Sequence, residues 1–190
     1  PEYIKLKPLI DEFIVNSVDF KLFQVRQHES LLAGCESDYI VPIEEGTANR
    51  LNDILVSVLE YEFPLRIDYV LVQGDTTTAM AVALNAFNKE IPVIHLEAGL
   101  RTYDKENPFP EESNRRIISG LASIHYCPTE RDAANLKRER YQYSSDILVT
   151  GNTVLDSLRD IPISKGNEVI ITLHRRENQA QMLSWFIVIE

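Results

Sequence analysis

The chain alternates between two patterns of apolar positions. Short segments that are apolar throughout are typical of buried strands, whereas longer segments with an apolar residue every three or four positions are typical of amphipathic helices. After an opening helix over residues 1–14, these patterns predict strand 20–25, helix 47–63, strand 67–72, helix 76–88, strand 92–96, helix 111–122, strand 124–127, helix 130–139, strand 146–150, helix 153–158 and strand 168–173.

Buried strands that are joined by helices form parallel sheets covered on both faces. We therefore predict an α/β fold with a doubly wound parallel sheet. Residues 161–167 have the composition of a linker, so we expect one domain over residues 1–160 and the start of a second over residues 161–190. The opening helix has no strand before it and the last residues are apolar, which leads us to expect a fragment.

Composition restricts the class of partner. The chain has 190 residues, of which 44% are hydrophobic and 25% charged, enough to bury one sizeable core. Its formal net charge of -10 argues against nucleic acid and anionic membranes, so an anionic ligand would need a local basic pocket. Cys35 and Cys127 lack the spacing of metal ligands and are expected to be buried thiols in a reducing compartment. No apolar run reaches the length of a membrane span, and we predict a cytoplasmic protein.

Acidic and basic side chains follow three of the predicted strands. Asp75 comes after strand 67–72, Glu97 after strand 92–96 and His174 after strand 168–173. Ligands of open parallel sheets bind outside the carboxyl ends of the strands. We therefore expect these three groups to lie at one edge, with His174 facing the two carboxylates across a cleft if the segment after the linker begins a second sheet.

Several of these residues also have purely structural interpretations. Asp75 precedes three threonines and, taken alone, is more simply explained as the N-cap of helix 76–88. Glu111 and Arg115 have the i, i+4 spacing of a surface ion pair. Glu97 has no helix to cap, and the glycine two residues later suggests close approach of a ligand to the backbone.

Two further positions are interpreted from the pattern alone. His95 lies inside strand 92–96 between apolar residues, so we expect it to pack within the sheet. Thr47 is a possible N-cap for helix 47–63.

The order of short motifs is more specific than any one residue. The segments "GDTTT", "HLEAGLRTYDKENPFPEESNRR", "CPTE", "GNTVLD" and "TLHRREN" follow one another between about Ile67 and Asn178. In this order they closely resemble the non-hydrolysing UDP-N-acetylglucosamine 2-epimerases. "EAGLRT" together with "PFPEESNRR" carries most of the resemblance. The family's opening strand and G-T-R-P-E loop are represented only by Pro1 and Glu2.

The resemblance implies a fold and an activity. Members have two Rossmann-like domains in the glycosyltransferase-B-type arrangement, of which the second would be incomplete here. They interconvert UDP-N-acetylglucosamine and UDP-N-acetylmannosamine for surface polysaccharides by eliminating UDP to give 2-acetamidoglucal and adding it back. Neither a metal nor a nicotinamide cofactor is expected. Members form homodimers and use the substrate as an allosteric activator, which we carry over as expectations.

The resemblance also implies roles for individual residues. The catalytic candidates are Asp75, Glu97, Glu111 and His174, and the substrate-binding candidates are Lys5, Arg101, Arg115 and Arg175. The carboxylates would move the proton at C2 of the sugar. The cationic side chains would stabilise the departing UDP.

Two other functions stay open. One is a hydrolysing 2-epimerase that releases N-acetylmannosamine, although "EAGLRT" argues against that branch. The other is a nucleotide-sugar-binding module without turnover, which would keep the basic pocket but has no physical need for four titrating groups.

Overall fold

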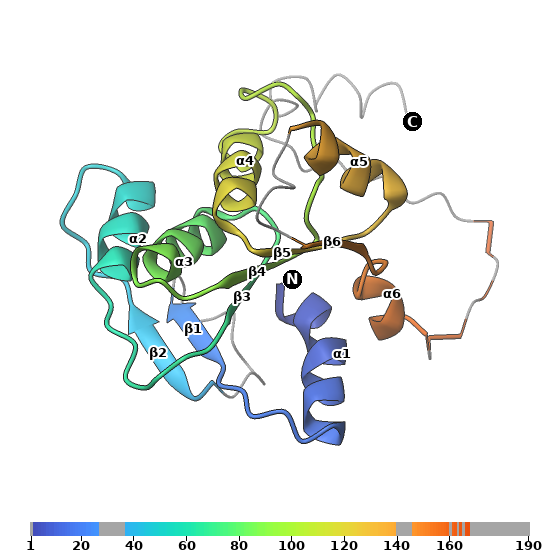
Figure 1. Cartoon of the computed structure of the whole chain (residues 1–190), viewed down its shortest axis with the longest axis horizontal. Helices are drawn as coiled ribbons and strands as arrows, with labels where there is room; N and C mark the ends of the chain where they lie inside the picture. The colour runs from blue at the N-terminus through green and yellow to red at the C-terminus, as the bar shows by residue number, and fades with distance from the viewer. Residues whose placement is uncertain are drawn as a thin grey trace. The chain divides into compact units, whose positions relative to one another are not determined.

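The computed structural model describes residues 2–26, 37–139, 146–159, 161–162, 164 and 166–167 (Figure 1). In chain order its elements are α1 (Glu2–Val15), β1 (Phe23–Arg26), β2 (Tyr39–Pro42), α2 (Arg50–Leu59), β3 (Val70–Gln73), α3 (Thr77–Asn88), β4 (Val93–Leu96), α4 (Glu111–Leu121), β5 (Ile124–Cys127), α5 (Glu130–Arg138), β6 (Asp146–Val149) and α6 (Val154–Ser157). The chain divides into two units, Pro1–Arg159 and Asp160–Glu190, and nearly all described residues belong to the first. None of the described helices is long and apolar enough to cross a membrane.

The sheet confirms the predicted α/β class. Strands β3, β4, β5 and β6 pair in parallel in that order, and β1 and β2 form a second parallel pair. Within the four-stranded sheet, α3, α4 and α5 connect successive strands. In Figure 1, α4 and α5 lie on one side of this sheet and α1 and α6 on the other. The carboxyl ends of all four strands consequently meet at one edge, where ligands of such sheets bind.

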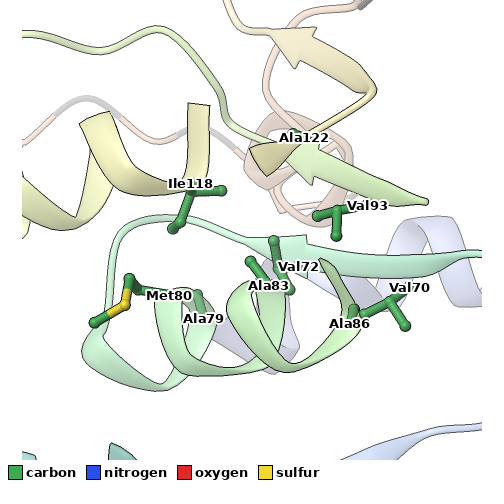
Figure 2. Close-up of a cluster of buried hydrophobic side chains, with 9 residues drawn as sticks. All are labelled: Val70, Val72, Ala79, Met80, Ala83, Ala86, Val93, Ile118 and Ala122. Atoms are coloured by element: carbon green, nitrogen blue, oxygen red, sulfur yellow. The ribbon is translucent and has the colours of Figure 1, made fainter. Parts of the chain in front are cut away.

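The largest cluster of buried apolar residues in the described structure surrounds β3 and β4. Its nine buried residues come from β3, α3, β4, α4 and the residue after α4, and Figure 2 shows them as Val70, Val72, Ala79, Met80, Ala83, Ala86, Val93, Ile118 and Ala122. Four of them lie on α3, and three of those four are alanines. Small side chains on that face let α3 pack closely against the sheet. This packing fixes the loop between β3 and α3.

Helix α2 differs from its predicted bounds at both ends. It is capped by Asn49, whose side-chain oxygen accepts the Leu51 N–H at 2.8 Å, whereas the Thr47 hydroxyl donates to the Asn49 carbonyl. The expected Thr47 cap is therefore wrong. At the other end, Tyr61 and Phe63 leave the helix because their rings pack edge-on against Phe23, with centroids 6.3 and 5.5 Å away. Strand β2, which pairs beside this aromatic cluster, was not predicted.

Candidate functional site

A pocket of about 250 Å³ lies at the carboxyl ends of β3 and β4. Its wall combines the turn after β3, the turn after β4, the first turns of α1 and one side chain of α4, and it consists of Glu2, Lys5, Gln73, Gly74, Asp75, Thr76, Glu97, Leu100 and Arg115. Two of the expected carboxylates, Asp75 and Glu97, are thus brought to one hollow. Two of the expected cations, Lys5 and Arg115, line the same hollow.

Glu97 occupies the turn after β4 in a left-handed backbone conformation, with φ of 66°. Non-glycine residues adopt this conformation at a cost of about 1–2 kcal/mol, which surrounding contacts must offset. Its Oε2 accepts hydrogen bonds from Lys5 Nζ at 2.6 Å and from Gln73 Nε2, and its Oε1 accepts one from Asn152 Nδ2 at 3.2 Å. These donors come from α1, β3 and the loop after β6. The carboxylate is therefore held at the pocket from three separate parts of the chain.

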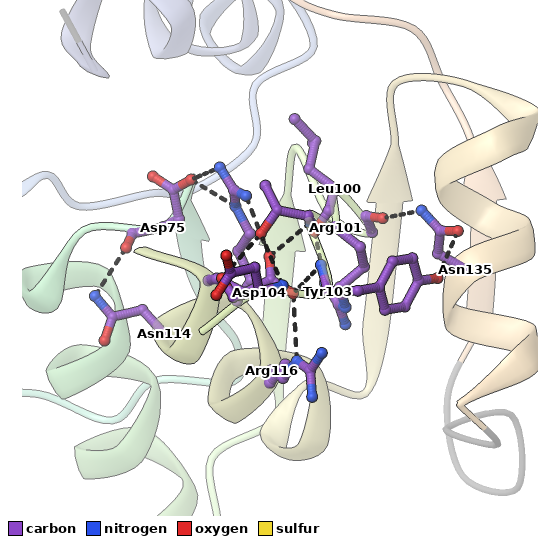
Figure 3. A network of polar contacts seen from close by, with 12 residues as sticks. Asp75, Leu100, Arg101, Tyr103, Asp104, Asn114, Arg116 and Asn135 are labelled. Carbon is purple, nitrogen blue, oxygen red and sulfur yellow. Dashed lines mark hydrogen bonds and ion pairs between the residues drawn. The ribbon is translucent and has the colours of Figure 1, made fainter. Parts of the chain in front are cut away.

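Asp75 does not cap α3. The N-cap is Thr76, whose Oγ1 accepts the Ala79 N–H at 3.1 Å, so the capping interpretation of Asp75 is wrong. The Asp75 carboxylate instead accepts from Arg115, with Nε at 2.8 Å and Nη2 at 2.7 Å from the same oxygen. Its backbone carbonyl accepts from Asn114 Nδ2 at 2.9 Å (Figure 3). Two consecutive residues of α4 hold Asp75 at the pocket.

The two glutamates that begin α4 have different surroundings. Glu111 does not pair with Arg115, so the predicted surface ion pair is wrong. One Glu111 carboxylate oxygen is buried without a hydrogen-bond partner among the described residues, and Glu111 is absent from the pocket wall. Glu112 is wholly buried and is the residue that contacts Arg115, at 3.3 Å. Its spacing to Arg115 and Arg116, i+3 and i+4, was the signal in the sequence that could have identified it.

Glu112 accepts four hydrogen bonds. The backbone amides of Thr102 and Tyr103 lie 3.0 and 3.1 Å from its oxygens, and Arg115 Nη1 and Arg116 Nε each lie 3.3 Å away. Burial by itself raises the pKa of the Glu112 carboxyl. The two amides and two guanidinium groups outweigh burial, and the pKa lies below its ordinary value. Glu112 is therefore held as a buried anion.

Arg101 lies apart from the pocket. Its side chain is wholly buried, its Nε and Nη2 lie 2.9 and 2.8 Å from the Glu139 carboxylate, and Nη2 also donates to Ser119 Oγ at 2.9 Å. This pairing ties the loop after β4 to α4 and to the end of α5. Arg101 is held in this ion pair and does not line the pocket, and its expected substrate contact stays a prediction.

Cys35, His174 and Arg175 lie outside the described residues. The expectations for these side chains remain predictions. Within the described ranges, His, Cys, Asp and Glu side chains form no group of three or more that could hold a metal ion.

His95 packs inside the sheet, as predicted. It is almost fully buried and its Nε2–H donates to the Gly74 carbonyl at 2.8 Å, since a carbonyl can only accept. His125 is its neighbour in register on β5, with ring centroids 6.4 Å apart. Loss of hydration on burial lowers the pKa of both rings to about 4. Burial likewise raises the pKa of the Cys127 thiol to about 11, so Cys127 is an unreactive core residue.

Because two histidines are buried, we expect the folded protein to lose stability in acid. Below pH 6.5 the unfolded chain protonates both rings, whereas the folded protein keeps them neutral until the pH approaches their pKa of about 4. The free energy of unfolding therefore decreases as the pH is lowered, by about 1 kcal/mol per histidine between pH 7.5 and 5.5. Urea unfolding at the two pH values measures the loss. His125→Phe is expected to remove about half of the histidine contribution, and an unchanged loss would assign the acid sensitivity to other groups.

Comparison with known proteins identifies similar chains. A family model described as UDP-N-acetylglucosamine 2-epimerase matches residues 20–189. The UDP-N-acetylglucosamine 2-epimerase of Escherichia coli strain K12 is 40% identical over 169 residues, which cover 83% of this chain and 44% of that protein. The chain spans about half the length of the curated relatives it matches.

Solved structures show the same similarity. UDP-GlcNAc 2-epimerase from Neisseria meningitidis, bound to UDP-GlcNAc, superposes with a TM-score of 0.75 at 39% identity, covering 84% of this chain and 46% of that one. The Methanocaldococcus jannaschii UDP-GlcNAc 2-epimerase, in complex with UDP-GlcNAc and UDP, gives a TM-score of 0.73 at 34% identity, covering 84% of this chain and 46% of that one.

Proposed function

Because this chain belongs to the UDP-N-acetylglucosamine 2-epimerase family, we propose that the protein interconverts UDP-N-acetylglucosamine and UDP-N-acetylmannosamine without hydrolysis. The observation that carries the proposal is that Asp75 and Glu97 line one pocket and that each carboxylate contacts a cation. Inverting C2 requires a proton to leave one face and arrive on the other. Two carboxylates at one hollow supply a base and a proton donor.

The proposed reaction runs in two balanced halves. A carboxylate takes the proton from C2, the C1–O bond to UDP breaks, and the electrons of the C2–H bond form the C1–C2 double bond of 2-acetamidoglucal. UDP then adds back at C1 while C2 receives a proton on the opposite face. Glu111 and His174 are further candidates for these proton transfers and for contact with the diphosphate.

Charge stabilisation of the leaving UDP is the second part of the proposal. Lys5 Nζ and the Arg115 guanidinium both line the pocket, and in the described structure each is neutralised by a carboxylate. A diphosphate entering the pocket would compete for these cations. Developing negative charge on a leaving group is stabilised most strongly by such fixed donors in a site that excludes water.

We extend the family's setting to this protein as part of the proposal. The enzyme would act as a cytoplasmic homodimer in the synthesis of surface polysaccharide, and neither a metal nor a nicotinamide cofactor enters the mechanism.

Reaction in deuterated water tests the mechanism. Incubation of the complete natural protein with UDP-N-acetylglucosamine is expected to give UDP-N-acetylmannosamine that carries deuterium at C2, because the incoming proton is drawn from groups that exchange with solvent. NMR and mass spectrometry of the product measure the label. Unlabelled epimer would reject proton abstraction at C2.

The same incubation separates the alternative functions. Sugar that retains UDP excludes the hydrolysing epimerase, whereas free N-acetylmannosamine would support it. Tight binding of UDP with no epimer formed would favour the binding module.

A further inference from the structure

We propose that Glu112 is a positioning residue of this pocket: its buried carboxylate holds one edge of the Arg115 guanidinium so that the other edge grips Asp75. The catalytic consequence rests on the proposed epimerase function. Glu112 does not line the pocket, so it would act through Arg115 and not on the sugar nucleotide.

The first support is the division of the Arg115 guanidinium. Nη1 faces Glu112 at 3.3 Å, while Nε and Nη2 lie 2.8 and 2.7 Å from Asp75. A guanidinium group is a rigid planar fork, so fixing one nitrogen sets the direction of the other two. Arg115 could otherwise place the same charge in several rotamers. The second carboxylate therefore selects the orientation that reaches Asp75.

The second support is that Glu112 is itself fixed from two sides. The amides of Thr102 and Tyr103 come from the loop after β4, and Tyr103 is anchored in turn by its hydroxyl, which donates to Asn135 of α5 at 2.9 Å (Figure 3). Arg116 supplies a fourth contact from α4, but its guanidinium is half exposed and adds little to the fixing by the two backbone amides. Glu112 thus joins the loop after Glu97 to the helix that holds Asp75. One carboxylate therefore links the loop after β4 to Arg115, which contacts Asp75 in the turn after β3.

A role in folding alone is the competing explanation. Removing one partner of a buried charge pair is strongly destabilising, so Glu112 contributes to stability under either view. Glu112→Gln has nearly the same shape, but its amide nitrogen would face two of the four donors. In either orientation of the amide, Arg115 loses the negative charge that attracts its guanidinium group, and in one orientation the amide nitrogen faces Arg115 itself. A decisive test must compare activity per folded molecule and ask whether the loss depends on Arg115.

A double-mutant cycle makes this comparison. In the complete natural protein, Glu112→Gln is expected to lower kcat for epimerisation by about 10–100-fold per folded molecule. In an Arg115→Lys background, which lacks the planar fork, the same change is expected to cost less than about 2-fold. Equal losses in both backgrounds would overturn the proposal. If the glutamine variant does not fold, Glu112→Asp, which keeps the charge but shortens the side chain, replaces it with the same expectation.

Arg116→Ala is the matched control. It removes another cation from Glu112, but Arg116 is half exposed and does not contact Asp75. Its kcat is expected to stay within about 2-fold of the unsubstituted protein. A loss as large as that of Glu112→Gln would mean that Glu112 acts through helix stability and would overturn the proposal.

A crystal structure of the Glu112→Gln variant separates this inference from the proposed function. Absence of epimerisation by the unsubstituted protein would reject the epimerase proposal alone. The positioning role is then decided by the Arg115–Asp75 contact. Separation of Arg115 Nε from Asp75 supports positioning, and a contact retained near 2.8 Å overturns it.

Discussion

Replacing Glu97 with Gln is expected to reduce the rate of epimerisation by about 10²–10⁴-fold, the range typical for loss of a general acid or base. Gln has nearly the same size and tolerates the same backbone, so the left-handed turn after β4 should persist. What disappears is the ability to accept or hold a proton in the pocket. Steady-state kinetics with UDP-N-acetylglucosamine, together with the deuterium label at C2, measure the change.

Asp11→Asn is the matched control for this substitution. It breaks a second lysine–carboxylate pair of the same helix, Lys7 with Asp11 at 2.6 Å, which is exposed and away from the pocket. Exposed pairs of this kind contribute little to stability because solvent screens them. Activity of Asp11→Asn should match the unsubstituted protein. Comparable activity of Glu97→Gln would remove Glu97 from the catalytic set.

Replacing Gly99 with Ala is expected to destabilise the protein by about 3 kcal/mol or more, because backbone strain and overpacking add. Gly99 has φ of 90°, a conformation that L side chains rarely adopt, and a Cβ there would lie 2.3 Å from the Asp132 carbonyl oxygen. The nearest atoms are backbone atoms of Asp132, so no flexible side chain can move aside to make room. The loop after β4 would have to shift away from α5. Denaturant unfolding at neutral pH measures the loss.

Gly151→Ala separates the two contributions. Gly151 has φ of 84°, but nothing lies within 4 Å of the position of its Cβ. Its substitution is expected to cost about 1–2 kcal/mol from backbone strain alone. Equal losses at Gly99 and Gly151 would show that the close approach to α5 relaxes without cost.

The order of strands and helices could be predicted because burial imposes it directly on the sequence. Strands covered on both faces are apolar throughout, and the helices between them keep an apolar face. Strand β2 is no shorter than β3 or β4, and it escaped prediction because only one of its four residues is buried and two are exposed. Helix ends were less predictable, since Thr47 and Asn49 are both good caps and tertiary contacts choose between them.

The pocket was predictable in outline because its carboxylates follow consecutive parallel strands. The cations that contact these carboxylates could not be predicted, since Lys5 is 92 residues from Glu97 and Arg115 is 40 residues from Asp75. The sequence spacing favoured Glu111 as the partner of Arg115, yet the turn before α4 directs Glu112 inward. One residue of helix rotation exchanges a buried side chain for a more exposed one.

The anchoring of α1 bears on how the protein is made. Besides the Lys5 contact, the Ile4 carbonyl accepts the Ser157 hydroxyl at 2.8 Å, and Glu97 needs Asn152 from the same late stretch. Helix α1 is therefore synthesised well before the residues of 152–157 that anchor it. Nascent chains that stop before Asn152 would lack the late contacts that hold α1 and the Glu97 carboxylate in place, and their pocket would be incomplete.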